Sequence, residues 1–228
     1  MQTGATLTAS ITKIINNHCQ NGRIYIHQLD GIKNNLLSDD YNGNNTIIKT
    51  QNVIIQLSKL DDQTNQDEEN VSNIDLGGCE DKLREENNME DNDYFIIYKI
   101  DIKTSDLSST FVSYEIFDSS LNHLNLDVCS DSQISIYVNA NLDETLANSA
   151  KRMSDSGYNL CDENDSFYND ICSTFTSANG TDILLSDRKS DIYSNIQNTS
   201  ICQTECELES YNVTNKKAKC NCDVVDNS

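Results

Sequence analysis

Nine cysteines in a chain of 228 residues constrain this fold more than any other feature of its sequence. They become denser toward the C-terminus, where the last four follow the spacing C-x3-C-x13-C-x-C from Cys202 to Cys222. Few large apolar residues lie in that stretch, so it cannot bury enough surface to stabilise itself without cross-links. Zinc is the alternative, but zinc ribbons favour C-x2-C pairs, which this stretch lacks. The spacing therefore predicts disulfides.

Eight of the cysteines form an even set, and the ninth stands apart near the N-terminus. Disulfides are expected among Cys79, Cys129, Cys161, Cys172, Cys202, Cys206, Cys220 and Cys222. Their connectivity stays open, because eight cysteines allow many pairings. Cys220 and Cys222 are too close to bond each other easily, so each is expected to bond a different partner. Cys19 is expected to remain unpaired or to bond another chain.

Six triplets fit the N-glycosylation pattern N-x-[ST]. Their asparagines are Asn44, Asn70, Asn164, Asn179, Asn198 and Asn212. A chain so rich in Asn, Ser and Thr forms such triplets by chance, so the cysteines carry more of the argument. The two features together predict an extracellular or cell-surface protein with N-linked glycans. Because the first residues lack the pattern of a signal peptide, we expect a mature chain or, preferably, a fragment of a longer protein.

Charge narrows the choice of partners. The chain has 16 basic and 37 acidic side chains and a formal net charge of -21. Such a field repels nucleic acids and anionic lipid headgroups and attracts cations. The sequence also has no apolar stretch long enough to cross a bilayer, so we expect no nucleic-acid partner and no membrane insertion by this segment.

Alternating apolar residues predict strands before residue 60. The expected strands cover residues 5–11, 23–29, 46–50 and 52–57. An acidic, polar stretch at 61–73 is predicted to be a linker. We therefore expect a small β-strand region at 1–60, whose isolated first strand could be exchanged between copies.

A larger domain is expected from residue 74 to 228. Short helices are predicted at 79–86 and 141–153, and strands at 94–102, 111–117, 124–129 and 134–138. Strands at this regular spacing are typical of an antiparallel β-sandwich, immunoglobulin-like or similar. From residue 157 onward the sequence is rich in turn residues, and we expect disulfides to hold it together.

No catalytic motif is evident. The three histidines are isolated, and the sequence contains neither H-E-x-x-H nor G-x-S-x-G, so we do not expect an enzyme or a cofactor. A hydrolase with a carboxylate pair is a weaker alternative, because acidic pairs are too common here to locate one. Calcium is the sharpest ligand candidate: residues 162–170 space oxygen side chains like an EF-hand loop. Phe167 replaces the glycine of that loop, so an ordinary turn is favoured.

The order of features between residues 74 and 222 resembles a cysteine-rich module of large surface proteins of ciliates and other protists. The resemblance is carried by Ile74–Glu80, Tyr98–Asp101, Ser113–Phe117, Leu124–Cys129 and, most specifically, the FYNDIC, NGTD and SDRK succession from Phe167 to Lys189. It covers about two thirds of the chain. The resemblance implies an extracellular location but no particular activity.

These observations favour a structural role. We expect a subunit or segment of an extracellular glycoprotein coat or filament that assembles with copies of itself. An N-terminal strand added to the sheet of a neighbouring copy would build open filaments. The alternative is a surface adhesin or a binding module that depends on glycans or Ca²⁺.

Overall fold

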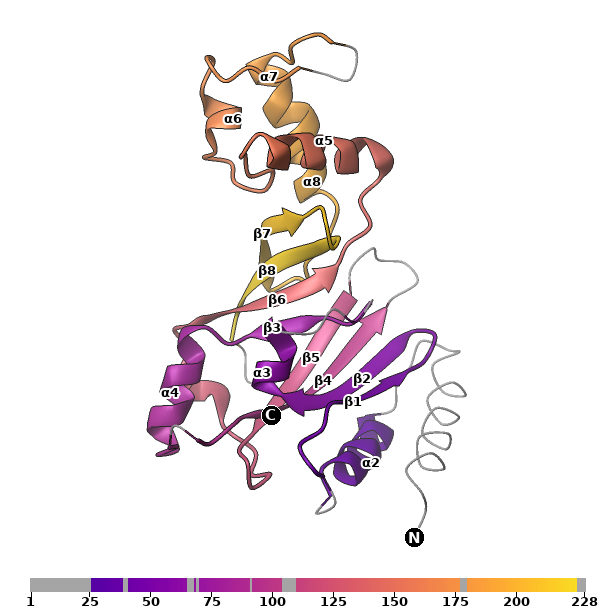
Figure 1. Cartoon of the computed structure of the whole chain (residues 1–228), viewed down its shortest axis with the longest axis vertical. Coiled ribbons are helices and arrows are strands. Elements are labelled where there is room, and N and C mark those ends of the chain that lie inside the picture. Colours follow the sequence, from indigo (N-terminus) through magenta and orange to yellow (C-terminus); the bar gives the residue numbers. More distant parts are fainter. Residues whose placement is uncertain are drawn as a thin grey trace. The chain divides into compact units, whose positions relative to one another are not determined.

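The computed structural model describes residues 26–38, 41–64, 68, 70–90, 92–103, 110–176 and 180–224, with side chains described from residue 31 onward. These residues divide into two compact units. Unit 1 contains the elements from the first described helix through Ile134, and unit 2 is formed by Ser135–Cys222. Each unit is described by itself below, and Figure 1 labels their elements.

The described strands form two four-stranded antiparallel sheets. The strands are β1 (Thr46–Lys49), β2 (Val53–Lys59), β3 (Asn73–Asp75), β4 (Ile96–Lys103), β5 (Thr110–Phe117), β6 (Gln133–Asn139), β7 (Cys206–Asn212) and β8 (Lys217–Asp223). Their orders are β1-β2-β4-β5 and β3-β6-β8-β7. The prediction of a mainly β, antiparallel fold is confirmed at this level.

Helices and helical turns connect these strands. They are α2 (Ile26–Leu36), α3 (Leu60–Thr64), α4 (Gly78–Glu86), the 3-10 turn η1 (Leu126–Cys129), α5 (Glu144–Asp155), α6 (Ser166–Asn169), α7 (Leu185–Asp187), the π-helical turn η2 (Arg188–Tyr193) and α8 (Ser194–Gln197). The last three follow one another without a break and form one helical segment over residues 185–197. None of the described helices has both the length and the hydropathy needed to cross a membrane.

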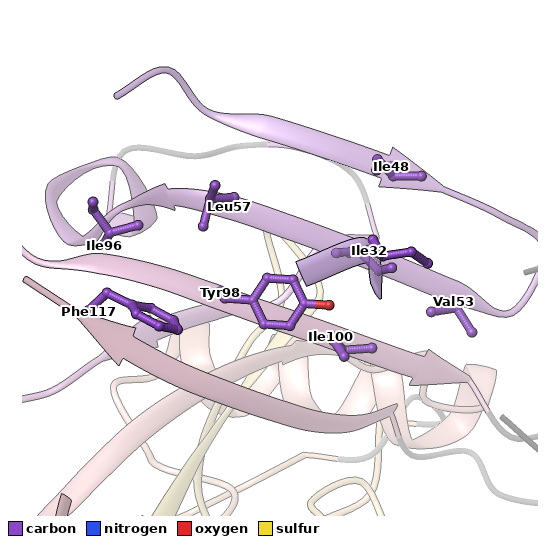
Figure 2. Close-up of a cluster of buried hydrophobic side chains, with 9 residues drawn as sticks. Ile32, Ile48, Val53, Leu57, Ile96, Tyr98, Ile100 and Phe117 are labelled. Atoms are coloured by element: carbon purple, nitrogen blue, oxygen red, sulfur yellow. The ribbon is translucent and has the colours of Figure 1, made fainter. Parts of the chain in front are cut away.

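The core of unit 1 lies on one face of the first sheet. Strands β2 and β4 pair in register from Val53 opposite Ile102 to Lys59 opposite Ile96. Because side chains alternate along a strand, every second residue of both strands reaches this face. Figure 2 shows the cluster that results, formed by Ile32, Ile48, Val53, Ile55, Leu57, Ile96, Tyr98, Ile100 and Phe117. Ile32 comes from α2, so this helix covers the apolar face of the sheet.

The strand predicted at 23–29 is wrong, because its described residues belong to helix α2. Over seven residues the run alternates like a strand, but Ile26, Leu29, Ile32 and Leu36 recur at intervals of three and four residues. That longer spacing places them on one helical face. Gly31 lies inside the helix.

The predicted division at a 61–73 linker is also wrong. Helix α3 begins at Leu60, and β3 begins at Asn73. Strand β2 from the first predicted region pairs with β4 from the second, so one sheet joins them. Asp61 and Glu68 are exposed, whereas Gln63 and Val71 are buried and anchor the stretch. The acidic composition of this stretch therefore does not mark a domain boundary.

Other predicted elements have mixed outcomes. Helices at 79–86 and 141–153 and strands at 46–50, 52–57, 94–102, 111–117 and 134–138 are confirmed, with ends shifted by a few residues. The strand predicted at 124–129 is instead bent into η1, where the Asn125 side chain accepts a hydrogen bond from the Asp127 N–H. The predicted exchanged strand at 5–11 lies outside the described residues.

Unit 2 has more regular structure than the turn-rich sequence predicted. Its helical part packs around an aromatic cluster in which Phe167 meets Tyr168 and Phe175 edge to face, with ring centroids 4.8 Å apart in both pairs. Its β part contains the hairpin β7–β8, which the sequence analysis missed. In β8 the buried residues alternate as Ala218, Cys220 and Cys222. The C-x-C spacing, which predicts disulfides, is also the two-residue period of this strand.

Candidate functional site

Three disulfides stabilise the described part of the chain. Cys79, buried in α4, bonds Cys129, buried at the end of η1. At the C-terminus, Cys202 bonds Cys220, and Cys206 bonds Cys222. Cys220 and Cys222 thus have different partners, as their spacing predicts. The second of these bonds joins directly opposite residues of β7 and β8, where few apolar side chains hold the two strands together.

Two of the eight cysteines differ from the prediction. Cys161 and Cys172 are free thiols in the structure, Cys161 buried and Cys172 exposed. Burial raises the pKa of the Cys161 thiol from its usual 9.0 to about 12, because a thiolate is poorly solvated there. The eight cysteines from Cys79 to Cys222 are even in number, but an even number does not require that all of them form disulfides. Cys19 lies outside the described residues, so its predicted state stays a prediction.

The predicted glycosylation sites are accessible where the structure describes them. Asn44, Asn70, Asn164, Asn198 and Asn212 are all exposed. Asn179 lies outside the described residues. Exposure leaves room for a glycan at five sites, while their occupancy stays a prediction.

The segment proposed as a calcium loop folds as turns around the short helix α6. Asp162 Oδ1 accepts from the Asn164 N–H at 2.8 Å, and Asp170 Oδ1 accepts from the Cys172 N–H at 2.8 Å. Asp165 caps α6 by accepting from the Phe167 N–H at 2.8 Å. These carboxylates bond neighbouring backbone groups and do not converge on one point. Throughout the described ranges, no three His, Cys, Asp or Glu side chains are grouped closely enough to hold a metal ion.

A buried polar cluster covers the second face of the β2–β4 pair in unit 1. Lys99 is 1% exposed, and its Nζ donates to Gln63 Oε1 at 3.2 Å and to the carbonyl oxygen of Ser72. Asp101, also 1% exposed, accepts from the Ser72 N–H at 2.8 Å and from the Ser72 hydroxyl at 2.6 Å. Gln63 Nε2 donates to Ser58 Oγ at 2.6 Å.

Such a lysine could in principle serve as a catalytic base or nucleophile. Here it is enclosed, and its bonds connect β4 with α3 and with Ser72, the residue that precedes β3. Buried polar groups that find partners fix one arrangement of the surrounding elements, because any other arrangement would leave them unsatisfied. The cluster therefore has a structural role, and it explains why residues 61–73 are ordered where described.

An open pocket of about 550 Å³ lies in unit 2, between α5 and the helical segment 185–197. It is lined by Asp143, Thr145, Leu146, Ser149, Asp182, Ile183, Leu184, Asp187, Asp191, Ile192 and Asn195. Leu146 and Ile192 are its buried apolar members, whereas Leu184 is 68% exposed. The lining contains four aspartates and no lysine or arginine, so the pocket is both acidic and partly apolar.

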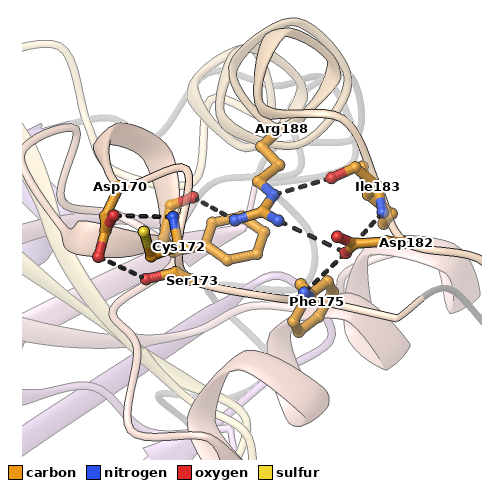
Figure 3. Close-up of polar contacts among 8 residues, drawn as sticks. Asp170, Cys172, Ser173, Phe175, Asp182, Ile183 and Arg188 are labelled. Atoms are coloured by element: carbon orange, nitrogen blue, oxygen red, sulfur yellow. Dashed lines mark hydrogen bonds and ion pairs between the residues drawn. The ribbon is translucent and has the colours of Figure 1, made fainter.

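Arg188 fixes the loop that forms one side of this pocket (Figure 3). Its side chain is 3% exposed and stacks over the Phe167 ring, 5.0 Å from the centroid. The guanidinium Nε donates to the Ile183 carbonyl oxygen at 3.1 Å, and Nη1 donates to the Phe167 carbonyl oxygen at 3.0 Å. Nη2 lies 3.5 Å from Asp182 Oδ1, which also accepts from the Phe175 N–H.

The four aspartates share one pattern of internal bonding. Asp143 Oδ1 caps α5, Asp182 Oδ1 faces Arg188, and Asp187 and Asp191 each accept a serine hydroxyl on Oδ1 at 2.9 Å. Among the described residues, none donates to the Oδ2 atom of any of the four. Each carboxylate is therefore held in place by one oxygen and has acceptor capacity left on the other.

The sequence analysis missed this pocket. Asp187, Asp191 and Asn195 have the spacing i, i+4, i+8, which places them on one face of a helix. That spacing was visible in the sequence, but the region was interpreted as turns, so its helical faces were not considered. His123, the one histidine whose side chain is described, lies in unit 1, with its Nε2 3.6 Å from Glu115 Oε2.

Comparisons with protein-family models, with curated proteins and with solved structures find no match for this chain. The pocket and the disulfides are therefore interpreted from their own geometry.

Proposed function

We propose that this chain is a non-catalytic segment of an extracellular glycoprotein that forms a coat or filament with copies of itself. The observation that carries the proposal is the disulfide framework. Two bonds stabilise the β7–β8 hairpin, and a third spans 50 residues of unit 1. Disulfides of this kind persist in oxidising compartments and are reduced in the cytosol. The resemblance to surface modules of protists is part of the same proposal and supports the same location.

The β-sandwich belongs to this proposal as well. Two four-stranded antiparallel sheets are what a sandwich requires, and an immunoglobulin-like or similar sandwich remains part of the proposal. Assembly by exchange of the strand predicted at 5–11 is a further part. No cofactor is included in this function beyond N-linked glycans.

The location is tested by secreting the chain from a eukaryotic host and mapping its cross-links and glycans without reduction. We expect the three disulfides and glycans on several of the exposed asparagines. Cysteines that are all reduced, together with bare asparagines, would contradict the extracellular assignment.

Self-assembly is tested separately, by electron microscopy and sedimentation of the secreted chain. We expect regular polymers that are lost when residues 1–16 are deleted. Polymers that persist unchanged after the deletion exclude strand exchange as their mechanism. A chain that stays monomeric at every concentration tested contradicts the structural role itself.

The second candidate is a surface adhesin or binding module, and the pocket of unit 2 is the observation that favours it. An open, partly apolar pocket with several acceptor groups is the usual form of a ligand site. Adhesion that is lost with a calcium chelator would make this module Ca²⁺-dependent. Adhesion that persists with a chelator would show that binding does not require Ca²⁺, and the pocket would then be the candidate site.

A further inference from the structure

The pocket of unit 2 combines two properties that together select a ligand class. Its buried apolar members, Leu146 and Ile192, favour an aliphatic group, because the transfer of such a group out of water lowers the free energy. Three of its four aspartates, Asp143, Asp187 and Asp191, favour positive charge, whereas the fourth, Asp182, already faces the Arg188 guanidinium. Leu184 at 68% exposure remains uncovered beside them, and few large apolar side chains among the described residues are as exposed.

We propose that this pocket binds an organic cation, in which a primary ammonium or guanidinium group ends an aliphatic chain. A lysine or arginine side chain of a partner protein and a free polyamine present this same chemistry. The inference extends the binding role named above and does not depend on self-assembly.

The bonding of the aspartates explains why a cation of this type fits. Asp187, Asp191 and Asp143 are each held by bonds to Oδ1, so their Oδ2 atoms can accept from a ligand without losing an internal bond. An ammonium group carries three donors, and a guanidinium group carries five. Either can satisfy several separated carboxylates at once. An inorganic divalent ion needs a tighter group of ligands, which the described residues do not provide.

Preorganisation supports the same assignment. Arg188 clamps the loop containing Asp182 and Ile183 through the Ile183 carbonyl oxygen and the Asp182 carboxylate. The opposite side of the pocket is the first turn of α5, which Asp143 caps. Both sides are thus fixed before a ligand arrives, which lowers the entropy lost on binding.

The experiment titrates the whole secreted chain with hexylammonium, hexanol, hexanoate and methylammonium and follows amide shifts by NMR. These probes separate the aliphatic body from the charge. We expect hexylammonium to shift residues of the pocket at millimolar concentration and to bind more tightly than each of the other three. Spermidine and the N-acetyl methylamides of lysine and arginine then distinguish a free polyamine from a protein side chain.

Two variants and a control make the test specific. Asp187→Asn with Asp191→Asn retains the Oδ1 acceptors but removes two charges, and should weaken hexylammonium binding about five- to tenfold. Asp155→Asn with Asp162→Asn removes two exposed charges elsewhere in unit 2 and should change it little. Ser149→Arg places a guanidinium on the wall of the pocket and should abolish the shifts.

Three results would overturn the proposal. Hexanol that binds as tightly as hexylammonium shows an apolar pocket without charge selectivity. Equal weakening by the control pair shows general attraction of cations to an acidic surface. Shifts that lie outside the pocket show a different site. Polymers seen or missing in the assembly experiment bear on none of these results, so the two proposals fail independently.

Discussion

At the scale of single residues, the most informative position is Asp101. Its two carboxylate oxygens accept both the backbone N–H and the hydroxyl of Ser72, and all of these groups are buried. Removing the acceptors leaves both donors without partners in a site that water does not reach. An unsatisfied buried donor costs about 1–3 kcal/mol.

We therefore expect Asp101→Ala to lower the free energy of unfolding by about 2–4 kcal/mol, measured by urea denaturation. Asp81→Ala is a matched control, because Asp81 is exposed on α4, and it should change the value by less than about 0.5 kcal/mol. If the two variants lose the same stability, the polar cluster does not hold α3 and β3 on the sheet.

The free thiols give a second prediction at this scale. Because the pKa of Cys161 is raised to about 12, its thiol should resist alkylation in the folded chain at pH 8 and react after denaturation. Cys172 is exposed and should react before denaturation. Peptide mapping by mass spectrometry reads each cysteine separately. Recovery of a Cys161–Cys172 disulfide would contradict the free state of both thiols.

The burial of such groups should also make the free energy of unfolding depend on pH in the alkaline range. The pKa values of Tyr41 and Tyr114 are raised to about 12 from 10.0, like that of Cys161 from 9.0, mainly because burial disfavours the charged form. The unfolded chain ionises first, so the stability from these groups is complete below pH 9 and is lost as pH rises to about 12. Urea midpoints at a series of pH values should therefore fall over this interval. A flat profile would show that these side chains are solvated.

At the scale of elements, the β7–β8 hairpin depends on covalent bonds more than on burial. Its two disulfides close loops with sequence separations of 18 and 16. In the chain-entropy account, a disulfide that closes a loop of this size restricts the unfolded chain and stabilises the fold by about 3 kcal/mol. We expect Cys206→Ser with Cys222→Ser to lower stability by about that amount and to speed amide exchange in β7 and β8.

The matched comparison for this variant is Cys79→Ser with Cys129→Ser. That bond lies in unit 1 and spans 50 residues, so its loss should cost about 4 kcal/mol while amide exchange in β7 and β8 stays slow. Fast exchange in the hairpin after loss of the unit 1 bond would contradict the separate roles of the two cross-links.

An element could be predicted from the sequence when its pattern of apolar residues was long enough to distinguish a strand from a helix. Strands β2 and β4 were predictable because long runs of Ile and Val have few alternatives to a buried strand. Helix α2 was not, because its first residues belong to the alternating run 23–29, and its helical period needs the eleven residues of Ile26–Leu36 to show. The pocket was missed for a related reason: Asp187 and Asp191 share a helical face only once residues 185–197 are known to be helical. The sequence places Lys99 and Asp101 within the predicted strand 94–102 but does not show that they are buried beneath α3 and Ser72.

At the scale of the whole molecule, charge imbalance sets the response to salt. The 16 basic side chains can pair at most 16 of the 37 acidic ones, so 21 acidic groups have no basic counterpart. The ion pairs that form are mostly at the surface, such as Lys49 with Glu68 at 2.6 Å, and such pairs contribute at most about 1 kcal/mol each. Repulsion among the remaining carboxylates opposes a compact state.

Salt screens both effects, and the excess of like charges decides the sign. The Debye length falls from about 30 Å at 0.01 M salt to about 8 Å at 0.15 M, which removes repulsion between distant carboxylates more than attraction within close pairs. We expect the urea midpoint to rise over this range of NaCl. Urea is the suitable denaturant because it is uncharged. A midpoint that falls with salt would mean that local ion pairs outweigh the excess negative charge.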